Sequence, residues 1–310
     1  MTKYLASLGG SAILLASAVF AAAQSPSDPK SLLTESFDLG GKHTPSAQFF
    51  VMASKLIIHA PDGKRVGSDI YRLRLKCNPA QAGKDGDEYV CARFTWQPDG
   101  GAETDIPALA DWTYVFKPSG GKKGQIFGID RARFDGIADS AGKALPPDKA
   151  FHVYNAFIDF HSFCNVFAER TGAGRGIQDL KKVGDKIVHA SAFSLPTVGP
   201  ESFFKNGEIT LEFKGLSRVK GKSCALIGYD SGESSFKMVF HPMPESNQTV
   251  GSSHYFGDIY KDLASGWVQK ATMTEIVVSE TTLGMPPNKT NAVIERLIEI
   301  HNLSQKDFEL

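Results

Sequence analysis

The feature that most constrains the fold is one long amphipathic helix. The rest of the chain has sequence patterns typical of strands and turns. Residues 146–170 read PPDKAFHVYNAFIDFHSFCNVFAER, and the glycine-rich stretch TGAGRG follows directly. Proline and an acidic side chain, here Asp148, suit the first turn of a helix, and glycine suits its end. The pattern therefore predicts a helix over 148–170.

One broad side of this predicted helix is apolar. At about 100° per residue, it collects Val153, Ala156, Phe157, Phe160, Phe163, Cys164, Phe167 and Ala168. A face this wide is better covered by a sheet than by one neighbouring helix. We therefore expect the phenylalanines either to seal a core against a sheet or to line a ligand cavity.

The helix also carries an acid and a histidine two positions apart, Asp159 and His161. Side chains two apart on a helix point about 200° away from each other and do not meet. A catalytic pair is therefore not expected. We expect a solvated aspartate and a histidine at the boundary of the core.

The rest of the chain alternates strand-like segments with turns. Residues 69–76 (DIYRLRLK) and 208–214 (EITLEFK) alternate apolar and polar side chains, which is typical of half-buried strands. Residues 293–301 (VIERLIEIH) fit a helix or a strand, and we favour a strand because a β-branched run at the end of a meander usually completes a sheet. The fold class is α+β, mainly β. We expect antiparallel strand meanders in two halves, forming a curved open sheet or half-barrel, with one long central helix.

The first residues predict export. Residues 1–23 combine Lys3, an apolar run and the small residues Ala-Ala-Ala before Gln24, the pattern of a cleaved signal peptide. A loose segment over 24–45 would precede a first β-rich half over 46–195 and a second half over 207–310, which we expect to be continuous with the first. No later run reaches the roughly 20 apolar residues that a transmembrane helix needs. We expect a periplasmic or extracellular location.

Charge and cysteine content limit the partners. Lys and Arg number 34 and Asp and Glu number 34, without a basic stripe, so nucleic acid is not an expected partner. Four cysteines in an exported chain permit two disulfides, and the candidates are Cys77, Cys91, Cys164 and Cys224. A hairpin bridge between the first two is the easiest geometry, while buried thiols are the alternative. The spacings match no zinc site, and we expect no metal or other cofactor.

Several segments resemble known sequences. Residues 257–275 (GDIYKDLASGWVQKATMTE), together with FGIDRARFDGIADSAG, YNAFIDFHSFCNVFAE and SSFKMVFHP, are similar to an uncharacterised family of secreted bacterial proteins. That resemblance implies no activity and transfers no catalytic residue. More loosely, the hairpin over 257–275 resembles periplasmic lipoprotein-carrier folds, in which a curved antiparallel sheet wraps an apolar cavity plugged by a helix. This second likeness concerns architecture only.

These patterns favour an exported, non-catalytic binding or carrier protein for an apolar small molecule or an envelope partner. The candidate cavity residues are Phe157, Phe160, Phe163, Phe167 and Trp267. An exported hydrolase is one alternative, although no Gly-x-Ser-x-Gly or His-Glu-x-x-His motif is present. A structural or carbohydrate-binding sandwich, using Trp96, Trp112 and Trp267, is the other. Phenylalanines packed solid, without an adjoining cavity, would count against an apolar ligand. The sequence indicates no oligomeric state.

Overall fold

The computed structural model describes residues 33–40, 43–80, 86–118, 125–167, 176–189, 193–194, 201–240, 247–284 and 288–310. The predicted signal peptide lies outside the described residues. In the described part, no helix has the length and apolar character needed to cross a membrane.

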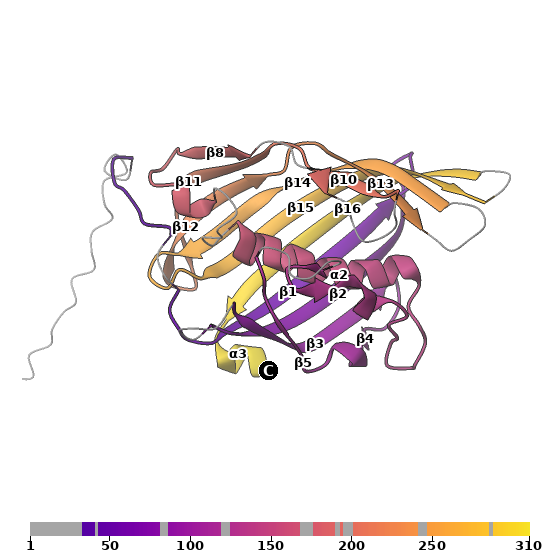
Figure 1. The fold of residues 1–310 in the computed structure, drawn as a ribbon, viewed down its shortest axis with the longest axis horizontal. Coiled ribbons are helices and arrows are strands. Elements are labelled where there is room, and N and C mark those ends of the chain that lie inside the picture. The colour runs from indigo at the N-terminus through magenta and orange to yellow at the C-terminus, as the bar shows by residue number, and fades with distance from the viewer. Residues whose placement is uncertain are drawn as a thin grey trace, which may run out of the picture.

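Fourteen of the described strands form one antiparallel sheet, which is open rather than closed on itself (Figure 1). Its main path runs β4-β3-β2-β1-β16-β15-β14-β12-β11-β8. The first long strand therefore pairs with the last, and strands from both predicted halves belong to one sheet. This architecture confirms the predicted fold class.

The strands of the first half are β1 (Gln48–His59), β2 (Arg65–Asn78), β3 (Glu88–Pro98), β4 (Thr104–Asp105) and β5 (Trp112–Val115), with a separate pair β6 (Gln125–Ile126) and β7 (Ile129–Asp130). Those that follow the long helix are β8 (Lys186–His189), β9 (Phe193–Ser194), β10 (Phe203–Lys205), β11 (Ile209–Val219), β12 (Lys222–Asp230), β13 (Ser234–Phe240), β14 (Asn247–Asp262), β15 (Val268–Leu283) and β16 (Asn288–Leu303). The favoured strand over 293–301 is confirmed as part of β16.

The helices are few in the described part. The α-helices are α2 (Pro147–His161) and the short C-terminal α3 (Gln305–Glu309). Single turns are η1 (Pro107–Leu109), η2 (Arg131–Phe134), η3 (Ser162–Val166), which is a π-type turn that continues α2, and η4 (Ile177–Asp179). The predicted helix thus extends to Val166 in α2 and η3, and its last predicted residues, 168–170, lie outside the described part.

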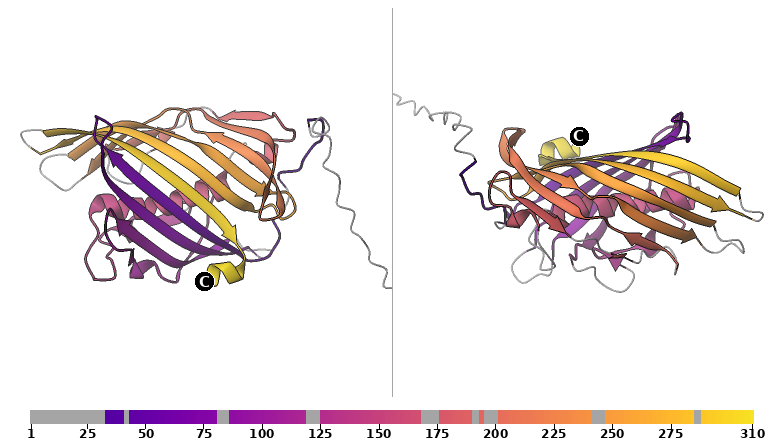
Figure 2. Two further views of the ribbon diagram at one scale, coloured as in Figure 1. Left: turned by 180° about the vertical axis from the view of Figure 1, so that it is seen from behind. Right: turned by 90° about the horizontal axis from the view of Figure 1, so that it is seen from above.

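Helix α2 lies across one face of the sheet, which we call the covered face (Figure 1). The opposite face, which we call the outer face, is seen from behind in Figure 2, with α3 at its lower edge. Alternate side chains of β1 follow this division, because Phe50, Met52 and Leu56 are buried under the helix while Val51 and Ala53 are only partly covered. The core therefore lies between α2 and the covered face, as the broad apolar helix face predicts.

The predicted disulfides are wrong. All four cysteines lie in the described part, all are buried, and no disulfide joins any two of them. Strand register explains why Cys77 and Cys91 of the β2–β3 hairpin are not bonded. Cys77 lies opposite Tyr89, while Cys91 lies opposite Leu75. The two thiols are therefore displaced along the ladder instead of facing each other across it.

Candidate ligand-binding site on the outer face

The predicted cavity phenylalanines are core residues in this conformation. Phe157 and Phe160 are completely buried and Phe163 is 2% exposed. The Phe157 ring lies 5.8 Å from that of Phe94 on β3 and also contacts Trp112 and Phe134. Phe167 is partly buried, with its ring 5.0 Å from that of Tyr229. An apolar ligand could reach these rings only if α2 moved.

The tryptophans are also held by the protein itself. Trp267 is 1% exposed, its Nε1 donates to the carbonyl of Thr44 at 3.0 Å, and His43 lies against its ring. Trp96 is partly buried, and its Nε1 donates to a carboxylate of Asp69 at 3.0 Å. Side chains held in this way do not form an exposed stacking platform for a sugar.

Asp159 is not solvated, which corrects the expectation from the helical projection. It is 5% exposed, and its carboxylate lies 2.7 Å from Nη1 of Arg296 on β16. The Nε of Arg296 lies 2.7 Å from Glu275 on β15, and the guanidinium also donates to the hydroxyl of Tyr255. Burial raises the pKa of Asp159 to about 7, while the Arg296 charge opposes that rise. These ion pairs tie α2 to two central strands.

His161 is not at the boundary of the core but completely buried. Its Nδ1 lies 2.8 Å from the Asn165 Oδ1, and its Nε2 lies 2.7 Å from the hydroxyl of Tyr114. Because an amide oxygen only accepts, Nδ1 carries the proton and Nε2 accepts from the tyrosine. Burial lowers the pKa of His161 to about 3. His161 and Asp159 therefore belong to two different hydrogen-bond networks.

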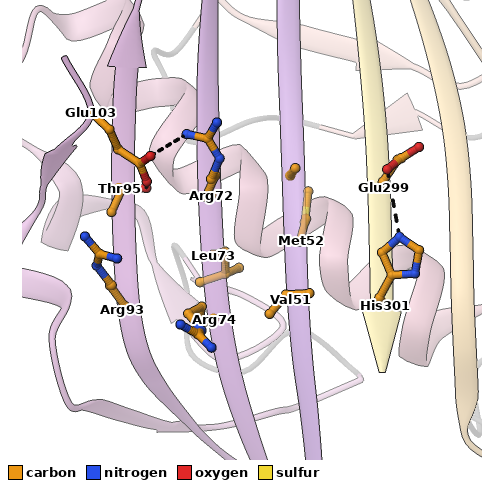
Figure 3. A pocket seen from close by; sticks show the side chains of 11 residues that line it. Val51, Met52, Arg72, Leu73, Arg74, Arg93, Thr95, Glu103, Glu299 and His301 are labelled. Carbon is orange, nitrogen blue, oxygen red and sulfur yellow. Dashed lines mark hydrogen bonds and ion pairs between the residues drawn. The ribbon is translucent and has the colours of Figure 1, made fainter. Parts of the chain in front are cut away.

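A pocket of about 300 Å³ lies on the outer face (Figure 3). It forms because β1 presents the short side chains of Val51 and Ala53 there, between longer polar side chains on both neighbouring strands. We call this pocket the outer trough. One wall carries arginines of β2 and β3, and the other carries Glu299 and His301 of β16.

Pairing register places four basic side chains on one rung across the outer trough. Arg93 lies opposite Arg74, Arg74 opposite Val51, Val51 opposite His301, and His301 opposite Lys270. Neighbouring strands are about 4.8 Å apart, so the backbones of Arg74 and His301 are separated by about 10 Å across β1. Like charges directly opposite each other disfavour a sheet, so this rung needs compensating contacts.

Some of the compensation comes from carboxylates at the edge of the outer trough. On this rung, Arg93 Nε lies 2.6 Å from Asp105. Two residues along β2 from Arg74, Arg72 Nη1 lies 3.0 Å from Glu103. Arg74 is held differently, because it donates to the carbonyl of Phe308 in α3 and lies 4.9 Å from the centre of that ring. Within the part of the chain that the structure describes, no carboxylate forms an ion pair with Arg74.

The opposite wall carries an acid and an imidazole. Glu299 Oε2 lies 3.8 Å from His301 Nε2. Burial lowers the pKa of His301, Glu299 opposes that shift, and the cations Lys270 and Lys220 add to it. This wall therefore carries charges of both signs near His301, the carboxylate of Glu299 and the ammonium groups of Lys270 and Lys220.

The outer trough has the chemistry of a binding site for an anionic group. Guanidinium and imidazole N–H groups match carboxylate and phosphate oxygens. Its lining includes no serine or cysteine, and its one hydroxyl, on Thr95, donates to Glu103. Among the described residues, no group of three or more His, Cys, Asp or Glu side chains could hold a metal ion.

Sequence reasoning did not identify this site. The alternation in residues 69–76 did place Arg72 and Arg74 on the exposed side of a strand, but nothing in the sequence pairs β1 with β16. The segments that resemble secreted bacterial proteins include parts of α2, β13, β14 and β15, and both resemblances stay predictions. No protein-family model and no curated protein matches this chain.

Proposed function

We propose that this is an exported, non-catalytic binding protein and that its ligand places an anionic group in the outer trough. The observation that carries the proposal is the position of Arg74, which strand register places across the short side chain of Val51 from His301, with all three residues lining the outer trough. No carboxylate among the described residues forms an ion pair with Arg74, so its remaining N–H groups are available to a ligand. An envelope component or a small molecule that carries an anionic group could be this ligand.

Isothermal titration with two trivalent or higher anions, citrate and inorganic pyrophosphate, tests the proposal. We expect the wild-type protein to bind at least one of them and Arg74→Met to lose about tenfold or more in affinity, because a hydrogen bond to a charged group is removed. Arg65→Met is the matched control, since Arg65 is an exposed arginine in an ion pair with Asp99 outside the trough. Wild-type protein that binds neither anion, or binding that Arg74→Met leaves unchanged, would refute the proposal.

An apolar ligand on the covered face is a second proposal. That face has a single helix, α2, over the apolar interior, and the packing of Phe157, Phe160 and Phe163 in that interior counts against this proposal. The ligand would have to displace α2, because the phenylalanines are packed as core. We expect native mass spectrometry of protein purified without denaturation from its exporting host to show an added lipid-sized mass. A bare polypeptide mass would count against this second proposal.

A further inference from the structure

We propose that the anionic group bound in the outer trough is a phosphate, held by Arg74 on one wall and His301 on the other, with Arg93 and Lys270 beside them. This inference rests on the proposed function and narrows it from anions in general to one chemical class. Its basis is the rung on which these four side chains lie, on β3, β2, β16 and β15.

The spacing favours a tetrahedral group over a planar one. A carboxylate is planar, and a single guanidinium fork satisfies both of its oxygens. A phosphate offers oxygens in several directions, so donors from both sides of β1 can contact it together. Arg74 and His301 lie about 10 Å apart at the backbone, and both line the same pocket on either side of Val51 (Figure 3).

The charge of the outer trough also favours an anion. Glu103 and Asp105 neutralise Arg72 and Arg93. Arg74 in the lining and Lys270 beside it add two positive charges, and Glu299 in the lining removes one. The Lys270 ammonium lies 5.6 Å from the centre of the Tyr260 ring. A phosphate close to its second ionisation carries between one and two negative charges, so the remaining positive charge attracts it.

Glu299 is the one lining carboxylate that opposes an anion, because it lies beside His301 on the same wall. Removing the Glu299 charge therefore distinguishes between two kinds of ligand. If the ligand group is a phosphate, removing the Glu299 charge should strengthen binding. If Glu299 instead binds a cationic part of a zwitterion, removing its charge should weaken binding.

The test titrates inorganic pyrophosphate and citrate into the full mature chain and into three variants. We expect pyrophosphate to bind more tightly than citrate, Arg74→Met to weaken pyrophosphate about tenfold or more, and Glu299→Gln to strengthen it by about twofold to fivefold. Lys270→Gln should weaken pyrophosphate binding by several-fold, and it replaces Arg74→Met in the test if that variant fails to fold. Arg65→Met should change nothing.

Citrate bound in an Arg74-dependent way, with pyrophosphate not bound, would overturn the phosphate class while leaving the proposed function intact. Binding of neither anion would overturn both. Pyrophosphate binding that Glu299→Gln weakens, or that neither Arg74→Met nor Lys270→Gln changes, would also overturn the inference.

A second arm identifies the source of the phosphate. Vesicles of phosphatidylcholine with phosphatidic acid present a phosphomonoester headgroup, and vesicles of phosphatidylcholine alone are the control. Sedimentation of the protein with the first vesicles only, reduced in Lys270→Gln, supports a lipid headgroup. Pyrophosphate binding without sedimentation supports a free phosphate compound.

Discussion

Replacing Arg296 with methionine is expected to destabilise the fold by about 3–5 kcal/mol at pH 8, because it leaves two buried carboxylates without their cation. Arg296 is 2% exposed, and it lies 2.7 Å from Asp159 and 2.7 Å from Glu275. Register puts Arg296 opposite Glu275, and Glu275 opposite Tyr255, on one rung of the covered face. Removing the cation therefore affects α2 and three neighbouring strands together.

The stability lost in Arg296→Met should be larger at high pH than at low pH. Burial raises the pKa of Asp159 from 3.8 to about 7, so the folded state holds this proton more tightly than the unfolded chain. The contribution of Asp159 to stability is therefore fully present below about pH 4 and is lost as the pH rises through 7. Without Arg296 the pKa of Asp159 rises further. The variant should consequently lose less stability at pH 5, where Asp159 is protonated, than at pH 8.

Urea unfolding at pH 5 and pH 8 measures both effects. Arg65→Met is the control, because its ion pair with Asp99 is about half exposed on each side and should contribute about 0–1 kcal/mol. A loss for Arg296→Met no larger than that of the control, or one that grows as the pH falls, would contradict the burial of Arg296 and its pairing with Asp159 and Glu275.

The sequence was informative wherever local periodicity decides the outcome. Alternation over residues 69–76 separated Tyr71, Leu73 and Leu75, which are buried, from the arginines between them. The broad aromatic face of residues 148–170 predicted a sheet to cover it, and α2 does pack against the covered face of the sheet. These conclusions depend on neighbours in sequence, so a single chain contains the information.

The predictions that failed concern contacts between segments that are distant in the sequence, and strand register decides those contacts. Asp159 falls on the polar side of a helical projection, yet it is buried because Arg296, 137 residues later in the chain, faces it from the last strand. The outer trough likewise exists only because β1 pairs with β16, which sets His301 across Val51 from Arg74. A local pattern cannot specify either pairing. The disulfide prediction failed for the same reason, since the offset between β2 and β3 decides whether two cysteines face each other.

Replacing Phe157 with alanine is expected to destabilise the protein by about 3–5 kcal/mol, through lost burial and the cavity that remains. Phe157 is completely buried, and rings from β3, β5 and η2 surround it, so little can move into the space. Phe256 on the outer face of β14 is the matched control, because it is 42% exposed and its removal should cost about 0.5 kcal/mol or less.

The same measurement bears on the two proposed ligands. A loss of about 3–5 kcal/mol for Phe157→Ala in urea unfolding means that α2 and the covered face form a closed core, and an apolar ligand would have to compete with all of that packing. A loss below about 1 kcal/mol would mean that the ring is loosely held, contrary to its contacts, and would favour an apolar ligand under α2. Binding in the outer trough does not require any packing to be displaced, because the short side chains of Val51 and Ala53 already separate its walls. An anionic ligand can therefore bind there without any displacement of the core, which is why we place the primary site on the outer face.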